Sequence, residues 1–439
     1  MQNFLLPEGV ETAFSRLEAS GFEAYLVGGC VRDMLMGSVP SDYDLTSNAK
    51  PEELCRVFRD YRVIETGIAH GTVTVLMDKL PLEITTFRTE GHYSDGRRPD
   101  AVHFCSNLSE DLARRDFTMN AMAYHPVVGL IDPYEGQKDL QARRIRCVGR
   151  ADKRFEEDAL RILRAIRFAS TLGFFLEAET EVALRLGARG LLRIAAERIR
   201  VELDRLLCGK DAPRVLVDYM DVLGIVLPEL ANLALHAQEQ NLSEITCALA
   251  HTPAEVILRW SVLLHAIGES GCHTPQDGEG WHPETPAMSS GKMADTLLCR
   301  LRFDRKSRER IVRLIEAQDV IRFQDEASLR SSISQYGIDL FFQILQVNRA
   351  IQLAKSSNHA ATLMQYDEIK TRAKHLLAEA PCLSLKNLAV KGQDIMNLGY
   401  EGPEVGQKLH WLLQIVLNGE EKNEKEILLS LLRGKMNEN

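Results

Sequence analysis

The first informative segment of the chain is Leu26-Val-Gly-Gly-Cys-Val-Arg-Asp33, and a second segment, Ser41-Asp-Tyr-Asp-Leu-Thr46, follows it closely. The first segment predicts a strand that ends at Gly28 and Gly29 and leads into a short helix. Glycines at such a turn let the backbone approach a ligand, and the helix N-terminus offers free N–H groups to a phosphate. The second segment predicts a neighbouring strand. Together they indicate a phosphate-binding turn beside an acidic strand.

Asp42 and Asp44 are predicted to share one face of this second strand, because side chains alternate along a strand. Two carboxylates on one face can hold hard divalent cations such as Mg²⁺. Two-metal sites of this kind align an attacking hydroxyl with a leaving pyrophosphate. The pattern therefore predicts a nucleotidyl-transfer centre, although either segment alone would also fit an ordinary turn or a solvated strand end.

Taken together, the two segments resemble the signature of the DNA polymerase β nucleotidyltransferase superfamily. The form Gly-Gly-x-Val-Arg-Asp resembles, more specifically, the class II tRNA nucleotidyltransferases and the bacterial poly(A) polymerases. The resemblance implies that Asp42 and Asp44 are the catalytic, metal-binding residues. It also implies that the nucleotide contacts four residues of the first segment: Gly28, Gly29, Arg32 and Asp33.

The composition is that of a globular protein with several domains: 439 residues, 45% hydrophobic and 26% charged. We find neither a bilayer-spanning run nor the basic start and apolar core of a signal peptide, so we expect no membrane partner and a cytoplasmic location. The nine cysteines form no C-x-x-C pair, so neither a zinc site nor a disulfide framework is indicated. The oligomeric state stays open, with a homodimer as one possibility.

The net charge of −9 argues mildly against nucleic-acid binding, but the charge is unevenly distributed. Between residues 143 and 167, nine lysines and arginines stand against four acids, a local charge of +5. A local basic strip of this kind can bind the phosphates of a nucleic acid.

Strand and helix signals alternate up to about residue 135, after which helical periodicity dominates. Helices are predicted near 8–20, 30–36 and 51–59, and strands near 24–28, 42–46, 61–65, 71–77 and 82–88. Loops are expected over 268–291 and 418–426. We predict a multidomain protein with an N-terminal α/β, polymerase β-like head and an all-helical remainder. The expected domains are a head (1–145), a neck with a nucleotide-selecting helix (146–208), a body (209–330) and a tail (331–439).

The last predicted strand of the head and the segment after it each carry a feature of interest. Glu83 is a candidate third carboxylate or an orienting group for the next segment, and a solvated strand end is an equal alternative. Thr89–Pro99 is polar, contains glycine and has no periodicity, so we expect a mobile loop. It resembles the flexible loop of family members that can add adenosine, which favours the use of ATP.

The segment Leu108–Tyr124 begins with Ser109 and two acids, which predicts a capped helix start. Arg115, with Arg114 beside it, could reach phosphates, and Asp116 could accept from a ribose hydroxyl. A charged helix face is the alternative for such residues. The string R-R-D-F-T-M-N-A resembles the ribose-recognition motif of class II enzymes, which favours the functional interpretation.

The segment Phe155–Ala169 is predicted to be one amphipathic helix. Its apolar arc should face a core and contains Ala159, Ile162, Leu163, Ile166 and Ser170. The opposite arc contains Arg161, Arg164 and Arg167, with Asp158 at its border.

An Asp/Arg pair can recognise the amine and the adjacent acceptor nitrogen that cytosine and adenine share. A solvated Glu157–Arg161 pair is the alternative. The string E-D-x-x-R resembles the protein template by which class II enzymes select CTP and ATP, so Asp158 and Arg161 are implied to contact the base. Arg164 and Arg167 would then flank the base site.

The helical remainder carries two weaker resemblances. Arg259–Gly268 resembles a motif of HD-type metal phosphohydrolases, but Ala266 stands where that motif requires its metal-binding aspartate. We therefore expect a degenerate, HD-like helical scaffold. Lys386–Val416 resembles the tail of Gram-positive-type CCA-adding enzymes, which implies contacts with the phosphates and shape of the tRNA elbow.

The resemblance covers nearly the whole chain and implies a class II CCA-adding enzyme. In such an enzyme the 3′-hydroxyl of tRNA attacks the α-phosphate of CTP or ATP with release of pyrophosphate. An A-adding or CC-adding enzyme and a bacterial poly(A) polymerase share the head motifs and stay open. From a different class, a non-catalytic RNA-binding scaffold with a degenerate head is the alternative.

Overall fold

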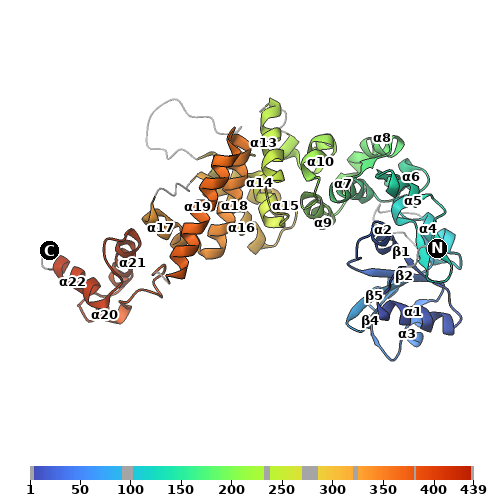
Figure 1. Cartoon of the computed structure of the whole chain (residues 1–439), viewed down its shortest axis with the longest axis horizontal. Coiled ribbons are helices and arrows are strands. Elements are labelled where there is room, and N and C mark those ends of the chain that lie inside the picture. Colours follow the sequence, from blue (N-terminus) through green and yellow to red (C-terminus); the bar gives the residue numbers. More distant parts are fainter. Residues whose placement is uncertain are drawn as a thin grey trace. The chain divides into compact units, whose positions relative to one another are not determined.

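The computed structural model of the protein describes residues 4–90, 102–231, 238–268, 285–319, 325–379 and 382–436. The chain divides into two compact units, Met1–Ala231 and Asn232–Asn439. Figure 1 colours the first unit from blue to green and the second from yellow-green to red. The predicted loop over 89–99 lies outside the described residues except for its first two positions, and so does most of the predicted loop over 268–291.

A seven-stranded mixed sheet forms the beginning of the first unit, in the order β3-β4-β5-β2-β1-β8-β9. The strands are β1 (Ala24–Val27), β2 (Tyr43–Ser47), β3 (Arg62–Ile64), β4 (Thr72–Met77), β5 (Leu80–Thr86), β8 (Ala123–His125) and β9 (Gly129–Ile131). β2 pairs with β5 in parallel, whereas the other neighbours are antiparallel. The predicted mixed head is confirmed.

Alternating side chains explain why this sheet forms. In β4, Val73, Val75 and Met77 are fully buried and alternate with partly exposed residues. Burying a side chain of this size contributes about 2 kcal/mol. Helices α1 (Glu8–Ala19) and α3 (Pro51–Val57) pack on β1 and on β4 and β5, respectively (Figure 1). These contacts bury one face of the sheet.

One prediction is wrong in the segment that connects β5 with β8. β6 (Arg88–Glu90) pairs with β7 (Val102–Phe104), and α4 (Leu108–Ala113) follows. The side chain of Asn107, not that of Ser109, caps α4, and it accepts a hydrogen bond from the Ser109 N–H at 2.8 Å. Asn107 lies just before the first helical residue, where an amide oxygen can reach the free N–H groups.

The helix predicted over 155–169 is two helices, so that prediction is wrong at one position. α6 (Ala151–Glu157) ends at Asp158, whose backbone is extended (φ −143°, ψ 104°), and α7 (Leu160–Leu172) starts directly after it. The Asp158 carboxylate accepts a hydrogen bond from the Leu160 N–H at 3.0 Å. Aspartate competes with the helix in this way by bonding to nearby backbone groups.

The two predicted arcs of α7 have different outcomes. The apolar arc is confirmed, because all five of its residues are buried: Ala159, Ile162, Leu163, Ile166 and Ser170. The arginine arc is not a solvated surface, since Arg161 and Arg167 are only 8% and 9% exposed. Both faces of this helix are therefore covered by protein.

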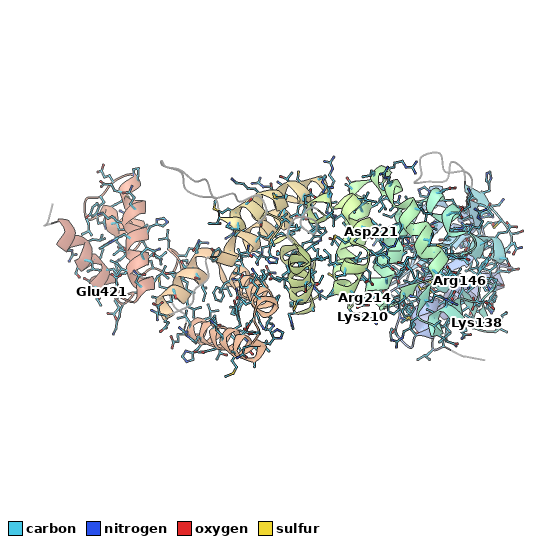
Figure 2. All side chains as sticks on the ribbon, turned by 90° about the horizontal axis from the view of Figure 1, so that it is seen from above. Lys138, Arg146, Lys210, Arg214, Asp221 and Glu421 are labelled. Atoms are coloured by element: carbon cyan, nitrogen blue, oxygen red, sulfur yellow. The ribbon has the colours of Figure 1, made fainter. Side chains whose placement is uncertain are left out.

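The remaining elements of the first unit are short strands and helices. They are η1 (Ile68–His70), η2 (Thr118–Asn120), α5 (Gly136–Gln141), β10 (Arg144–Ile145), β11 (Phe175–Leu176), α8 (Ala178–Gly187), η3 (Ala188–Arg193), α9 (Ala196–Leu207), α10 (Ala212–Asp218) and α11 (Met220–Val226). Among them, α9, α10, β10, β11 and η3 contact α7. Arg214 pairs with Asp211 at 2.6 Å and with Asp218 at 2.8 Å, and Arg185 pairs with Asp221 at 2.5 Å. Figure 2 labels Arg214 and Asp221 among the side chains of these helices.

The described part of the second unit is helical throughout, as predicted. It contains α13 (Gln238–Ala250), α14 (Val256–Leu264), α15 (Pro286–Arg300), α16 (Arg305–Glu316), η5 (Ala317–Asp319), α17 (Glu326–Tyr336), α18 (Ile338–Lys355), α19 (His359–Ala378), α20 (Gly392–Met396), α21 (Pro403–Asn418) and α22 (Lys425–Met436). Residues 382–432 build an apolar core of their own around Val390, Ile395 and Leu412. Among the described residues, we find no helix with the length and apolarity needed to cross a bilayer.

The motif region with Ala266 lies inside this helical unit. His265 is 2% exposed, and its Nδ1 lies 2.7 Å from the carbonyl oxygen of Val262. Burial is the main reason why the pKa of His265 falls to about 4. Ala266 is buried beside it. His265 therefore packs in the core as a neutral side chain.

This burial predicts an acid-sensitive second unit. The unfolded chain protonates His265 near pH 6.5 but the folded chain only near pH 4, so stability falls as the pH is lowered between these values. Between these two pH values, protonation of His265 should lower the free energy of unfolding by up to about 1.4 kcal/mol for each pH unit. Urea denaturation followed by tryptophan fluorescence measures it, because all three tryptophans belong to this unit. His265→Phe should flatten the dependence, and an unchanged slope would contradict the assignment.

Candidate functional site

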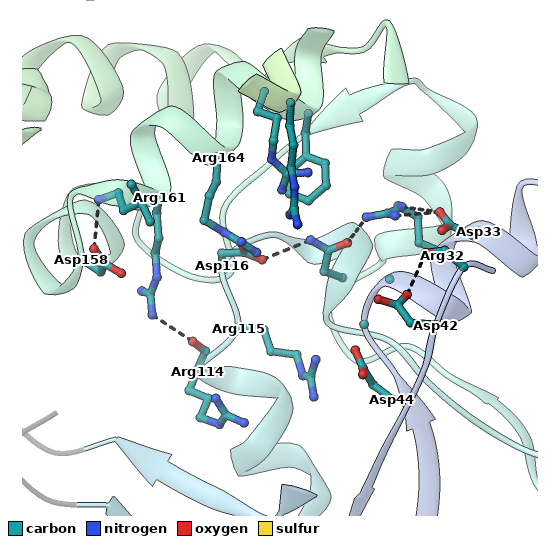
Figure 3. A pocket seen from close by; sticks show the side chains of 18 of the residues that line it. Arg32, Asp33, Asp42, Asp44, Arg114, Arg115, Asp116, Asp158, Arg161 and Arg164 are labelled. Atoms are coloured by element: carbon teal, nitrogen blue, oxygen red, sulfur yellow. Dashed lines mark hydrogen bonds and ion pairs between the residues drawn. The ribbon is translucent and has the colours of Figure 1, made fainter. Parts of the chain in front are cut away.

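A cavity of about 770 Å³ opens within the first unit (Figure 3). It brings together all twelve residues that the sequence proposed for the site. Its charged lining consists of eight arginines and five aspartates: Arg32, Arg114, Arg115, Arg161, Arg164, Arg167, Arg198, Arg205, Asp33, Asp42, Asp44, Asp116 and Asp158. Such a polar, cationic lining suits a polyanionic ligand rather than an apolar one.

Asp42 and Asp44 form the acidic end of the cavity. Asp42 directly precedes β2, Asp44 lies within it, and Glu83 is the register partner of Asp44 on β5. Burial, together with the negative charges of Asp42 and Glu83, raises the pKa of Asp44 to about 6 against the opposing effect of Arg115. Figure 3 shows both aspartates at the β2 side of the cavity.

This donor set fits a divalent cation. Carboxylate oxygens are hard ligands, and a cation between Asp42 and Asp44 would relieve the repulsion that raises the Asp44 pKa. Among the described residues, no group of three or more His, Cys, Asp and Glu side chains is arranged to hold a metal ion. The role of Glu83 stays a prediction.

The glycine turn between β1 and α2 (Gly29–Leu35) lies next to these carboxylates. Gly28 has φ +76°, a region that other residues rarely adopt. A Cβ atom at Gly28 would lie 3.1 Å from Nη1 of Arg115. Glycine at this position therefore permits both the sharp turn and the close approach of the arginine.

A chain of hydrogen bonds connects α2 with α7 across the cavity. Arg32 donates to Asp33 at 2.7 Å and to Asn120 Oδ1 at 2.9 Å, and Asn120 donates to Asp116 at 3.2 Å. The second carboxylate oxygen of Asp116 accepts from Arg164 at 2.8 Å. The network fixes the orientation of two arginines on opposite sides of the cavity (Figure 3).

Asp116 is the buried centre of this network, with 8% exposure. Burial alone would raise its pKa, but the charge and hydrogen bonds of Arg164, with the hydrogen bond from Asn120, lower the pKa to about 2. Asp116 is therefore a carboxylate that stays charged and accepts hydrogen bonds at neutral pH.

The predicted base-selecting residues have other partners in this structure. Arg198 donates to Asp158 Oδ2 at 2.7 Å, and Arg161 donates to Glu157 at 2.5 Å and to the backbone oxygen of Arg154 at 3.2 Å. The Glu157–Arg161 pair that formed the solvated alternative thus exists, but Arg161 is buried and lines the cavity. Both side chains are held in place before any ligand binds.

Further along α7, the ring of Phe168 lies close to the guanidinium groups of Arg167 and Arg32. The guanidinium of Arg167 lies 3.8 Å from the centre of the Phe168 ring, and that of Arg32 lies 5.2 Å from it. Arg167 Nε also lies 2.6 Å from Glu202. Burial lowers the pKa of Arg167 to about 10 despite this carboxylate.

Sequence reasoning assigned no role to six lining residues: Ser41, Asn120, Leu160, Phe168, Arg198 and Arg205. Asn120 is part of the string R-R-D-F-T-M-N-A, so it had a motif signal. Arg205 had none, because a single arginine in an amphipathic helix has no distinguishing pattern.

Three family models match the chain. The Poly A polymerase head domain matches residues 24–146, the tRNA nucleotidyltransferase domain 2 matches 274–432, and the "Probable RNA and SrmB-binding site of polymerase A" matches 173–233. The CCA-adding enzyme of Latilactobacillus sakei is 35% identical over 416 residues, 94% of either chain. The chain belongs to the CCA-adding enzyme family. The member from Geobacillus stearothermophilus is 34% identical over 426 residues, 95% of this chain and 94% of the relative.

Solved structures of this family agree with the fold. The crystal structure of the Bacillus stearothermophilus CCA-adding enzyme in complex with CTP is 30% identical and has a TM-score of 0.74, with 99% of this chain and 100% of that chain covered. The Thermotoga maritima CCA-adding enzyme complexed with tRNA is 21% identical with a TM-score of 0.60 and covers 98% and 96%, which shows the shared fold. The expected nucleotidyltransferase class and the head-plus-helices architecture are confirmed.

The ion pair between the buried Asp116 and Arg164 allows a prediction about stability. Asp116→Asn should lower the free energy of unfolding of the first unit by about 3 kcal/mol at pH 7, because the partly buried Arg164 loses its closest carboxylate and keeps the more distant Glu202 at 3.8 Å. The difference should shrink between pH 4 and pH 2, since an acid whose folded pKa is depressed loses its contribution as the pH falls through that pKa.

Urea denaturation followed by circular dichroism measures this effect, and tryptophan fluorescence should show an unchanged second unit. Asp152→Asn, which breaks an exposed ion pair with Arg150, is the matched control and should change little. Equal stability of the Asp116 variant and the wild type at pH 7 would contradict the structural role.

Proposed function

We propose that this chain adds C, C and A to the 3′ end of tRNA, using CTP and ATP and releasing pyrophosphate. The observation that supports the proposal best is one cavity in which an acidic pair and oriented arginines meet the base-selecting residues Asp158 and Arg161. The relative at 30% identity binds CTP, as its structure's description states. Relatives of lower identity with the same fold are described in complexes with ATP and tRNA.

Asp42 and Asp44 would hold Mg²⁺. When bound, such cations neutralise the triphosphate and lower the pKa of the attacking hydroxyl. Gly28 and Gly29 would let the backbone approach the triphosphate, and Arg32 would contact it. Asp33 would act on the position of Arg32, to which it is bonded at 2.7 Å.

Arg115 and Asp116 would contact the phosphate and ribose region. The carboxylate of Asp116 accepts hydrogen bonds and keeps its charge at neutral pH, which suits a ribose hydroxyl as donor. Arg164 would serve here through its bond to Asp116 and, with Arg167, would flank the base. Hydrogen bonds already orient Asp116 and Arg164, so these side chains are positioned before the nucleotide binds.

Asp158 and Arg161 would select the base. The carboxylate of Asp158 can accept a hydrogen bond from the exocyclic amine of cytosine or adenine, and Arg161 can donate to the adjacent ring nitrogen. Uracil and guanine present a carbonyl oxygen where the amine would be, so a carboxylate faces a second acceptor and repels it. One pair of side chains can thus accept CTP and ATP and reject UTP and GTP.

The proposal extends to the remaining parts of the chain. We place head, neck, body and tail at 1–145, 146–208, 209–330 and 331–439, with the tail as a tRNA contact. The cytoplasm is the proposed location, since tRNA-processing relatives act there in bacteria. The curated relatives are named CCA-adding enzymes, which favours complete CCA addition over the A-adding, CC-adding and poly(A) alternatives.

A primer-extension assay tests this function. The purified protein and Mg²⁺ are incubated with tRNA trimmed to its discriminator base and with CTP, ATP or both, and the 3′ ends are sequenced. Ends in CCA are expected when both nucleotides are present. Ends in CC would indicate a CC-adding enzyme, addition only to tRNA that already ends in CC an A-adding enzyme, and long A tails a poly(A) polymerase.

The same assay includes a metal-site control. Asp42→Ala, or chelation of Mg²⁺, should abolish addition of every nucleotide, whereas Asp60→Ala, which alters an exposed carboxylate outside the cavity, should leave it intact. Full activity of the Asp42 variant would refute the metal assignment. No addition by the wild type would return the chain to the RNA-binding scaffold class.

Base selection gives a second prediction. Asp158→Ala should reduce the preference for CTP and ATP over UTP and GTP by about tenfold or more, because the acceptor for the exocyclic amine is removed. Asp158→Asn keeps the size but supplies a donor, so it should favour UTP further. The readout is kcat/KM for each nucleotide. Unaltered selectivity in both variants would exclude Asp158 as the base-selecting residue.

A further inference from the structure

Helix α9 presents a stripe of charged residues to the cavity. Arg198, Glu202 and Arg205 are four and three residues apart, so at about 100° per residue they fall on one face of the helix. Arg198 and Arg205 both line the cavity, separated by about 10 Å along the helix axis. No motif of the chain covers Arg205.

Arg205 differs from the other arginines of the cavity in its partners. Each of the other seven has a carboxylate oxygen within 3.1 Å: Arg32, Arg114, Arg115, Arg161, Arg164, Arg167 and Arg198. For Arg205, which is exposed, no ion pair or hydrogen bond occurs with any residue that the structure describes. Its charge is therefore available to a ligand.

Contacts of α9 place Arg205 at the end of the cavity away from Asp158. Arg198 bonds to Asp158, and Glu202 pairs with Arg167, one turn before Arg205. The guanidinium of Arg167 lies on Phe168, whose ring Arg32 also approaches. Along α9, Arg205 thus lies beyond Glu202, on the side away from Arg198 and its bond to Asp158.

We propose that Arg205 binds a phosphate group of a substrate in this cavity. Arginine supplies a planar fork of donors that fits a phosphate, and an unpaired guanidinium does so without first breaking an internal ion pair. The reaction brings two sources of phosphate to this place, the triphosphate of the incoming nucleotide and the backbone of the RNA strand. The inference rests on the proposed function for the identity of these two ligands.

Equilibrium binding to the full-length protein separates the two sources. Arg205→Ala should weaken the binding of CTP by about tenfold if the triphosphate is the ligand, with CMP binding unchanged. If the RNA backbone is the ligand, the variant should instead weaken tRNA binding, and the slope of log K against log salt should fall by about 0.7. Arg205→Lys should keep part of the affinity in either case.

Arg62→Ala is the matched control, because Arg62 is an exposed arginine of β3 outside the cavity. It should change neither affinity. Unaltered binding of both CTP and tRNA by Arg205→Ala would overturn the proposal, and so would equal losses in the Arg205 and Arg62 variants. These measurements need no turnover, so a wild type that binds both ligands but adds no nucleotide would refute the proposed function and leave the role of Arg205 to be decided separately.

Discussion

A buried carboxylate, that of Asp116, connects the two sides of the cavity. One of its oxygens accepts from Asn120, which holds Arg32 on α2, and the other accepts from Arg164 on α7. A charge that is removed from water is stable only when it is paired and hydrogen-bonded, so this network has few alternative arrangements. The relative position of the glycine turn and the α7 arginines depends on it.

Charge is distributed unequally along the cavity. The arginines are mostly matched to carboxylates, which lowers the cost of collecting so many cations in one place. Asp42 and Asp44, by contrast, have no arginine within ion-pair distance among the described residues, and their mutual repulsion contributes to the raised pKa of Asp44. The protein thus keeps one end of the site suited to cations and the remainder suited to the anions that a nucleotidyltransferase handles.

The second unit follows a simpler principle. Its helices bury apolar faces, and His265 and Ala266 are part of that core. The helical repeat of apolar residues was enough to predict a helical scaffold here, and alanine at position 266 agreed with it. Burial of an apolar stripe depends mainly on local sequence.

The sequence by itself determined the mixed head and the helical remainder, and it predicted residues that line one cavity, since strand alternation and the spacing of Asp42 and Asp44 are local properties. Only the tertiary structure decided the break at Asp158 and the pairing of that residue with Arg198. It also decided which arginines are buried and that Arg205 keeps an available charge. These outcomes depend on ion pairs and hydrogen bonds between residues that are far apart in the chain. Such contacts leave no repeating pattern in the sequence from which they could be predicted.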